Sequence, residues 1–483
     1  MNSSIMNTRH YISGRWEDSP EHIDVYSPID GRTIGRIPSA DSKCVDIAVH
    51  AARSAFRSWS SVSLAQRLAY VRAMGEYIAD NSDRFAEVEC NDTGFLLSFM
   101  KSGLVRRAAK NFSYYADFAE RLGAKPQEIN GKGASNWIFY KPAGVVAVII
   151  PWNAPLVLAT WKVAAALAAG NTIVLKPAEL APLSCALLAE AAEAINLPAG
   201  VFNVIHGTGK QAGAALAEHA AIDRLAFTGS TVTAKSIGES CALSITPVSF
   251  ELGGKSPLIV FADSDLQAAC DQVLSQFNHA GQICAAGTRI IVESDIEPKF
   301  RTMVLSSLME KAVVGDPRHP DTTVGPLISE DQLVKVEGFV NRALACGATL
   351  LAGGKRHSRG GQYFEPTIMT DVAMDAEIYQ EEVFGPVLIW STFVDDQDAV
   401  TQANATRYGL GGYLWCNDSA RALAVAQAIR TGTVWVNGST RDLDTPFGGC
   451  GDSGIGREGG LWGWEFFSDI TNVAIKKFRS QST

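Results

Sequence analysis

The sequence predicts an α/β protein whose first domain is built on a parallel sheet. Four short β-branched runs follow Gly144 and are separated by alanine-rich helical segments: VVAVII, NTIVLK, VFNVI and RLAFTG. Such an alternation builds a parallel sheet with helices on both faces, so the first domain is expected to be Rossmann-like. A second α/β domain is expected from about Gly253 to Ser453, with strands around Val260, 290–292, 387–393 and 433–436.

The elements before and after these strands complete the predicted architecture. Helices are expected from Ser42 to about Ala119, where apolar residues recur at three-to-four spacing, and they are expected to pack around a core rather than to carry chemistry. The stretch KPQEINGKGASNWIFYKP predicts an extended β arm, and the strand-like tail TNVAIKKF is expected to pair with it, in the same chain or in a neighbour. The expected divisions are 1–121 with 142–252, then 253–452, and the arm at 122–141 with 466–483.

Composition excludes several classes of protein. The 483 residues are 47% hydrophobic, and 42 Lys and Arg against 51 Asp and Glu give a net charge of -9. A mildly acidic chain argues against a nucleic-acid partner. Nine scattered cysteines without a Cys-x-x-Cys pair predict a reducing compartment and no metal. Neither a signal peptide nor an apolar membrane span is recognisable, which predicts a soluble, cytoplasmic protein with no membrane partner.

One cysteine is placed as a nucleophile would be. Cys284 closes a Gly-Gln-x-Cys turn and has small neighbours, which leave room for a substrate carbon to reach the sulfur. The alternative is a buried cysteine that only packs. The pattern therefore indicates a catalytic thiol only if other catalytic groups accompany it.

Two further motifs supply such groups. Glu251 ends the strand-like run PVSFEL before two glycines, where a carboxylate could act as a general base. Asn153, in PWNAPL, offers a side-chain amide to a developing oxyanion. Taken singly, the first could be a surface glutamate at a strand end and the second part of a turn.

Seven motifs taken together resemble the aldehyde dehydrogenase superfamily along essentially the whole chain: PWNAPL, KPAE, FTGST, ELGGKSP, FNHAGQIC, EEVFGPV and PFGGCGDSGIGRE. The resemblance implies oxidation of an aldehyde to a carboxylic acid through a thiohemiacetal and a thioester on Cys284. Glu251 would activate water, Asn153 and the backbone N–H of Cys284 would form the oxyanion hole, and Glu458 would relay a proton. Glu251 also favours the hydrolytic, non-acylating type of enzyme, since relatives that acylate coenzyme A generally lack this base.

The resemblance further implies a bound NAD, with NADP less favoured. Lys176 and Glu179 would hold the adenine ribose, where the carboxylate repels a 2'-phosphate, and Gly229 and Ser230 would meet the pyrophosphate at a helix N-terminus. Glu382 would hold the nicotinamide ribose and Phe384 the ring. Ala234 stands where relatives have a glycine. The full expected cofactor set is Ile149, Pro151, Trp152, Lys176, Glu179, Gly209, Gly213, Phe227, Gly229, Ser230, Leu252, Glu382 and Phe384. Without the motifs, Lys176 and Glu179 could be solvated loop residues.

The same resemblance defines a substrate tunnel whose walls favour an apolar or aromatic aldehyde. The expected lining is Ala154, Val157, Leu158, Trp161, Ile283, Ala285, Arg441 and Phe447. Ala154 replaces a large aromatic residue of many relatives, which would widen the tunnel. In the alternative hypothesis Arg441 pairs with the carboxylate of a semialdehyde, unless it pairs with Asp442 or Asp444 in a solvated loop. His279 replaces the usual Asn and is interpreted as structural.

The arm and tail are implied to form the contact between subunits of a homodimer or homotetramer. The cluster LWGWEFF is interpreted as core or interface packing. Two other functional classes stay open: a non-catalytic protein that retains the fold, and a thiol hydrolase that works without NAD. The second leaves the predicted cofactor residues without a use.

Overall fold

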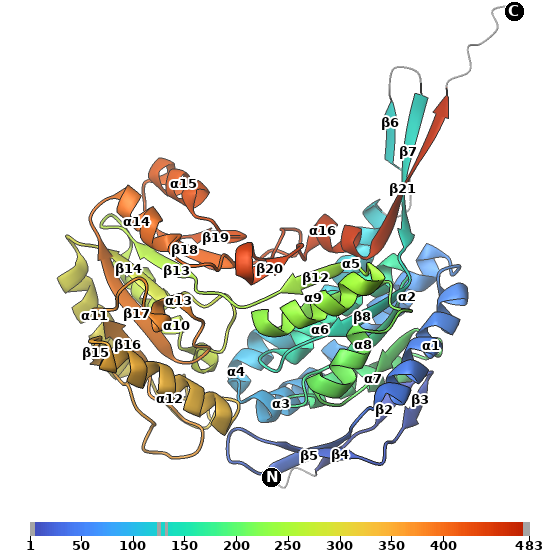
Figure 1. Ribbon diagram of the computed structural model, residues 1–483, viewed down its shortest axis with the longest axis horizontal. Helices are drawn as coiled ribbons and strands as arrows, with labels where there is room; N and C mark the ends of the chain where they lie inside the picture. The colour runs from blue at the N-terminus through green and yellow to red at the C-terminus, as the bar shows by residue number, and fades with distance from the viewer. Residues whose placement is uncertain (1–4, 123–126, 131–133, 477–483) are drawn as a thin grey trace, which may run out of the picture.

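The computed structural model describes residues 5–122, 127–130 and 134–476, which form two large sheets with their helices and a projecting arm (Figure 1). The first sheet has eight strands and contains all four runs predicted after Gly144. Its strand order is β20 (Gly454–Ile455), β12 (Val248–Glu251), β11 (Arg224–Thr228), β8 (Val145–Ile149), β9 (Thr172–Lys176), β10 (Phe202–Val204), β2 (His10–Ile12) and β3 (Arg15–Glu17). The five strands from β12 to β10 are parallel, which confirms the predicted parallel sheet.

Alternate residues of the central strands pack against helices on opposite faces. Val146 and Val148 belong to one apolar core, whereas Val145 and Ala147 belong to another. Such alternation of side chains is the normal geometry of a strand covered on both sides. On the first face, α6 (Pro155–Ala169) and α7 (Leu183–Ala194) lie against the sheet, and the same core includes α2 (Leu64–Asp80), α3 (Ser82–Thr93), α4 (Leu97–Phe99) and α5 (Val105–Leu122). The second core includes α1 (Ser42–Trp59), α8 (Ala214–Ala217) and α9 (Thr231–Ser244).

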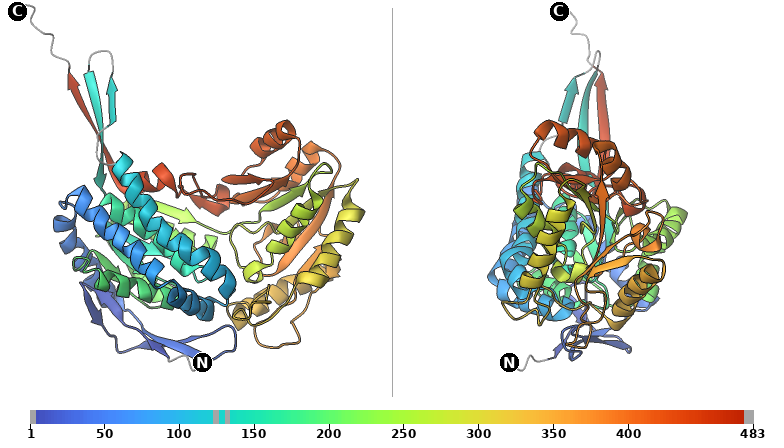
Figure 2. Two further views of the ribbon diagram at one scale, coloured as in Figure 1. Left: turned by 180° about the vertical axis from the view of Figure 1, so that it is seen from behind. Right: turned by 90° about the vertical axis from the view of Figure 1, so that its left-hand side faces the viewer.

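The second sheet has seven strands and lies in the other half of the molecule (Figure 2). Its order is β15 (Thr349–Ala352), β16 (Thr367–Thr370), β17 (Val387–Phe393), β14 (Arg289–Glu293), β13 (Pro257–Val260), β18 (Gly411–Trp415) and β19 (Thr433–Val436). All pairs are parallel except β15 with β16, and the four predicted strand positions lie in β13, β14, β17 and β19. The helices of this half are α10 (Leu266–Ser275), α11 (Glu297–Lys311), α12 (Glu330–Ala345), α13 (Glu377–Gln380), α14 (Asp396–Ala403) and α15 (Ser419–Ala428).

The arm consists of β6 (Gln127–Asn130), β7 (Ala134–Pro142) and β21 (Ser468–Lys476), and it extends away from the body (Figures 1 and 2). Strand β21 pairs antiparallel with β7 of the same chain over nine residue pairs, from Ser468–Pro142 to Lys476–Ala134. Of the two predicted pairings, the one within the chain is confirmed. Phe466 ends helix α16 (Gly460–Phe466) and does not belong to the strand, while residues 477–483 of the predicted tail lie outside the described residues.

The sequence did not indicate a third, small sheet of β1 (Met6–Asn7), β5 (Thr33–Pro38) and β4 (His22–Tyr26) near the start of the chain. No helix in the described part of the chain is long and apolar enough to cross a membrane.

Candidate active site

The two sheets bring three of the four predicted catalytic residues, Cys284, Glu251 and Asn153, to one cavity of about 210 Å³, and Glu458 is not part of its lining. Strands β8, β11 and β12 end at the same edge of the eight-stranded sheet, because Ile149 pairs with Phe227 and Thr228 pairs with Glu251. The loops that follow them supply one wall, and the segment before β14 supplies Cys284. The lining is Pro151, Trp152, Asn153, Leu158, Thr228, Gly229, Ser230, Glu251, Leu252, Gly253, Cys284, Gln332, Lys335, Glu382 and Phe384.

A hydrogen bond connects Asn153 to the segment that carries Cys284. The Nδ2 amide of Asn153 donates to the carbonyl of Gln282 at 3.0 Å, two residues before the half-buried cysteine. Burial raises the pKa of the Cys284 thiol to about 11, although the nearby Arg441 acts in the opposite direction. A Cβ on Gly254 would lie 2.6 Å from the carbonyl oxygen of Cys284, so only glycine permits this close approach. The site therefore holds a thiol of raised pKa next to a side-chain amide.

Glu251 is a buried carboxyl beside a buried ion pair. It ends β12, it is 4% exposed, and neither carboxyl oxygen has a hydrogen-bond partner among the described residues. Nζ of Lys162, on α6, lies 2.5 Å from Oε1 of Glu458. Burial first, and then the charge of Glu458, raises the pKa of Glu251 well above its usual range, while Lys162 opposes the shift. A carboxyl group with this surrounding keeps its proton to a higher pH than an ordinary glutamate does.

The adenosine end of the expected cofactor site is also assembled. Lys176 ends β9, its Nζ donates to the carbonyl of Pro177 at 3.0 Å, and it pairs with Glu179 at 3.3 Å. Oε1 of Glu179 accepts from the backbone N–H of Gly209 at 3.3 Å, and Gly213 lies against the Lys176 side chain. The predicted set is therefore close together before any ligand binds.

The loop after β11 begins helix α9, as the motif predicts. Ser230 caps the helix, and its Oγ accepts from the backbone N–H of Thr233 at 3.2 Å. A Cβ on Gly229 would lie 2.4 Å from the ring of Phe227, so the backbone can pass this ring only with a glycine. Ala234, the departure from the family pattern, is buried in the core and leaves the loop unobstructed.

At the opposite end Glu382 and Phe384 line the cavity with Cys284. Oε1 of Glu382 accepts from the backbone N–H of Gly254 at 2.9 Å, and the ring of Phe384 meets Trp152 edge-on at 5.3 Å between centroids. Burial raises the pKa of Glu382 to about 7.

Gln332 and Lys335, on α12, also line the cavity but were missing from the predicted set. The Nε2 amide of Gln332 donates to the carbonyl of Phe384 at 2.8 Å and so fixes the loop that carries Phe384. Both look like ordinary polar residues of an amphipathic helix, so the sequence contains no signal for them.

The predicted tunnel residues differ in their exposure. Leu158 lines the cavity, and Ala154, Val157 and Ile283 are half-buried. The rings of Trp161 and Phe447 pack at 5.5 Å between centroids, and both are nearly buried. The side chain of Ala285 is fully buried in the apolar core, where its carbonyl accepts from the hydroxyl of Tyr413 at 3.0 Å.

A second cavity of about 670 Å³ is lined by the cationic residues Arg107, Lys110 and Arg441. The Arg107 guanidinium lies 5.4 Å from the Trp161 ring centroid, and that of Arg441 lies 4.8 Å from the Phe447 ring centroid. The arginines therefore cover the outer faces of two packed aromatic rings. The pKa of Arg107 is lowered by burial and then by the charge of Arg441, so the two cations lie close enough to repel each other. Helix α5, expected to serve only the core, supplies Arg107.

Neither arginine has a carboxylate within ion-pair distance among the described residues, 5–122, 127–130 and 134–476. Asp444 instead faces Arg121 at 3.7 Å and accepts a hydrogen bond from the hydroxyl of Tyr114. Arg441 therefore does not form the pair with Asp442 or Asp444 that would have explained it as a loop residue.

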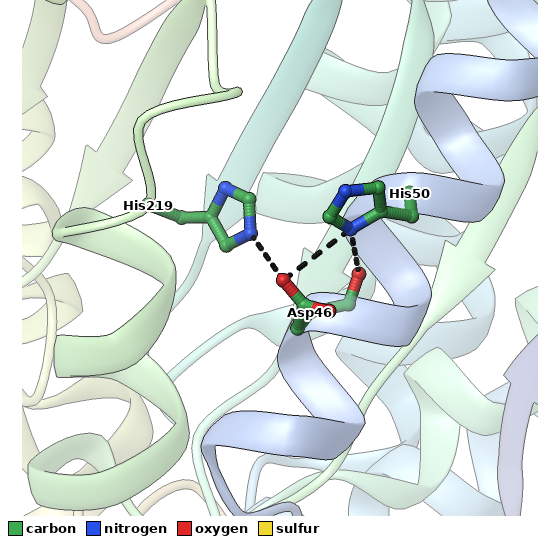
Figure 3. Close-up of side chains that lie close together, drawn as sticks. All are labelled: Asp46, His50 and His219. Atoms are coloured by element: carbon green, nitrogen blue, oxygen red, sulfur yellow. Dashed lines mark hydrogen bonds and ion pairs between the residues drawn. The ribbon is translucent and has the colours of Figure 1, made fainter.

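A polar cluster outside this site joins Asp46 and His50 of α1 to His219 (Figure 3). Nε2 of His219 lies 3.2 Å from Oδ1 of Asp46, and its Nδ1 accepts from the backbone N–H of Ala221 at 3.1 Å. The ring proton is thus on Nε2, the atom that faces Asp46. A metal-binding histidine needs the opposite arrangement, with the far nitrogen as donor. The cluster is therefore interpreted as a structural polar contact that joins α1 to the segment before β11.

Comparisons with known proteins agree with this geometry. The sequence profile described as the aldehyde dehydrogenase family matches residues 16–473. The chain is 40% identical to 2-hydroxymuconic semialdehyde dehydrogenase of Pseudomonas sp. (strain CF600), over 97% of this chain and 99% of the relative, and 41% identical to aminoaldehyde dehydrogenase 2 of Zea mays, over 96% and 94%. The crystal structure of betaine aldehyde dehydrogenase from Staphylococcus aureus in complex with NAD+ superposes with a TM-score of 0.94 at 34% identity, covering 99% of this chain and 97% of that one.

The fold and site thus define an oxidoreductase that acts on aldehydes. The chain belongs to the aldehyde dehydrogenase family.

Proposed function

We propose that this enzyme uses NAD to oxidise an aldehyde that carries a carboxylate at its far end. The observation that supports this substrate class is the pair Arg107 and Arg441, which lie over Trp161 and Phe447 without a carboxylate partner in the described chain. Asp442 also lines this cavity but forms no ion pair with either arginine, so the two guanidinium groups are free to take a substrate carboxylate. The apolar or aromatic aldehyde expected from the sequence accounts for the rings but not for the cations.

The relatives divide along the same line. Two semialdehyde dehydrogenases, for 2-hydroxymuconic and for 2-aminomuconic 6-semialdehyde, are 40% and 38% identical to this chain, and betaine aldehyde and aminoaldehyde dehydrogenases are equally similar. Overall identity therefore does not separate the two groups. The charge of the proposed substrate site does separate them, because two arginines without a carboxylate partner would repel a quaternary ammonium or an amine and attract a carboxylate.

For the reaction itself we propose the roles implied by the motifs. The Cys284 thiol loses its proton to water and the thiolate attacks the carbonyl carbon, while the amide of Asn153 and the backbone N–H of Cys284 stabilise the oxyanion of the thiohemiacetal. When bound, NAD would accept the hydride that turns this adduct into a thioester. Glu251 takes a proton from water as the water attacks the thioester, and the carboxylic acid leaves while Cys284 is restored. Lys162 and Glu458 lie where they can stabilise or relay the proton of Glu251.

The residues present fit NAD. A Cβ on Gly253 would lie 2.2 Å from Oε2 of Glu382, so only a glycine lets the backbone pass this carboxylate, which lines the cavity with Cys284. The Lys176–Glu179 pair presents a carboxylate where NADP would have its 2'-phosphate, and this supports NAD as the preferred cofactor.

Subunit contact is proposed for the arm. Strands β6 and β21 are its two outer strands, and the arm exposes apolar side chains at Ile129, Ile470, Val473 and Ile475. Unpaired edges and exposed apolar residues support association into a homodimer or homotetramer.

The experiment measures NADH formation by wild type, Arg441→Ala and Arg107→Ala with succinic semialdehyde, a neutral aldehyde of equal length and a trimethylammonium aldehyde. Each substitution is expected to lower kcat/KM for the semialdehyde by about 10- to 100-fold, because a charge-assisted hydrogen bond contributes about 1.5–3 kcal/mol. The other two aldehydes should change by less than about 3-fold or improve. Equal losses for all three substrates would refute carboxylate recognition, and a fully active Cys284→Ala would refute the proposed chemistry.

A further inference from the structure

The segment before the nucleophile has an unusual backbone. His279 and Ala280 have φ angles of 52° and 51°, and Gly281 follows with 70°. Three consecutive residues in the left-handed region are rare, because a Cβ crowds the backbone there, although histidine and asparagine tolerate it better than alanine does. A Cβ on Gly281 would also lie 2.1 Å from the carbonyl oxygen of Gly385. The turn therefore has to be held by specific contacts.

His279 makes those contacts. Its ring is completely buried and stacks on Phe95 with 4.2 Å between centroids and 9° between planes. Its carbonyl oxygen accepts from both the backbone N–H and the Nε2 amide of Gln282, at 3.1 and 3.0 Å. The side chain of Gln282 is fixed at its other end, where Oε1 accepts from the backbone N–H of Ile328 at 2.9 Å. The left-handed turn, the stack and Gln282 form one rigid unit.

This unit contacts the residue that would face the oxyanion. Through Gln282, whose carbonyl accepts from Nδ2 of Asn153 at 3.0 Å, it fixes the amide that would face the oxyanion. The ring of His279 has no hydrogen-bond partner among the described residues, so its contribution is the stack on Phe95. Burial lowers the pKa of His279 to about 3, so the ring stays neutral.

We propose that His279 is a positioning residue that holds Asn153 and the Cys284 loop in register, so that the oxyanion hole is formed before substrate binds. The inference rests on the proposed roles of Cys284 and Asn153. It assigns no proton transfer to His279, which acts only through Asn153 and Gln282. An asparagine at this position tolerates the left-handed backbone better than an alanine does and keeps a planar side chain beside Phe95, whereas an alanine removes the stack.

The test compares His279→Asn and His279→Ala with wild type, and uses the surface variant His50→Ala as a matched control. Three rates are measured: aldehyde oxidation, hydrolysis of p-nitrophenyl acetate, and alkylation of Cys284 by iodoacetamide. The first two build an oxyanion, and alkylation does not. We expect His279→Ala to lower kcat of both oxyanion reactions by roughly 10- to 100-fold, less than or equal to the loss of a whole oxyanion donor. Alkylation and the KM for NAD should stay close to wild type, and His279→Asn should recover kcat to within about 3-fold.

Three results would overturn the inference: wild-type kcat in His279→Ala, an equal loss of alkylation and catalysis, or no recovery in His279→Asn. Cys284→Ala and Asn153→Ala separate this failure from that of the proposed function. If both are inactive while His279→Ala is fully active, only the positioning role is wrong. If Cys284→Ala is active, the proposed chemistry is wrong whatever His279 does.

Discussion

Nζ of Lys162 and Oε1 of Glu458 form a 2.5 Å ion pair inside the protein, where Lys162 is 1% and the Glu458 side chain 9% exposed. Each charge depends on the other, since removal of one partner leaves an uncompensated buried charge. Lys162→Met is therefore expected to lower the free energy of unfolding by about 3–5 kcal/mol, measured by urea denaturation. The double variant Lys162→Met with Glu458→Leu should recover much of the loss. Additive losses in the double variant would show that the two charges are not coupled.

The raised pKa of Glu251 predicts that turnover increases with pH. The water-activating form is the carboxylate, and burial together with Glu458 raises its pKa well above the usual range. Turnover limited by thioester hydrolysis should therefore increase with pH as Glu251 loses its proton. Glu251→Gln should abolish this limb and slow hydrolysis more than the first formation of NADH, which stopped-flow measurements resolve. An unchanged pH profile in Glu251→Gln would assign the base to another residue.

Buried histidines predict acid instability. Burial lowers the pKa of His10 to about 4 and that of His206 to about 3, from 6.5 in the unfolded chain. Below pH 6.5 these histidines are protonated in the unfolded chain but stay neutral in the folded protein. The free energy of unfolding is therefore highest above pH 6.5 and falls as the pH is lowered toward 4 and 3. Each histidine should contribute a slope of up to about 1.4 kcal/mol per pH unit. His206→Gln should reduce the slope of unfolding free energy against pH between 6 and 4, whereas the exposed His319→Gln should leave it unchanged.

Glu179 predicts the preference between the two cofactors. Its carboxylate is half-buried and lies beside Lys176, where a 2'-phosphate would add a second negative charge. Glu179→Gln is expected to raise kcat/KM with NADP relative to NAD by roughly 10-fold, through loss of like-charge repulsion. The ratio of initial rates with each cofactor measures the effect. If the ratio does not change, selectivity depends on another group.

Gly281 predicts a steric limit next to the nucleophile. Gly281→Ala would place its Cβ 2.1 Å from the carbonyl oxygen of Gly385 at a φ of 70°, so the turn cannot keep its shape. We expect kcat to fall at least 10-fold, in line with the sensitivity of catalysis to misplacement of about 1 Å. Gly103→Ala has open space around its Cβ and is the matched control for rate and stability. Wild-type activity in Gly281→Ala would show that the turn is adaptable.

Local patterns explain how much of the fold could be predicted. The β-branched runs at 145–150 and 171–176 became β8 and β9 because a buried parallel strand needs little more than a continuous apolar run. The small sheet of β1, β4 and β5 gave no such signal, since its strands are short and their buried and exposed residues do not alternate regularly. Motif recognition located Cys284, Glu251 and Asn153, which the structure brings to one cavity.

The sequence does not reveal contacts between residues that lie far apart in the chain and meet only in the fold. Arg107 lies 334 positions before Arg441, in a helix whose pattern indicates only a core face, and nothing in the sequence states that the two meet. The role proposed for His279 likewise depends on its contacts with Phe95 and Gln282, which only the folded chain defines.

The pairing of β21 with β7 sets the order in which the arm can be completed. Pro142 emerges early during synthesis, but its partner Ser468 follows only after both large sheets have been made. Until then β7 has one open edge, and a nascent or truncated chain presents that edge to any other strand nearby. Only chains made as far as residue 476 therefore have both edges of β7 paired. Only these chains can present the finished arm to another copy.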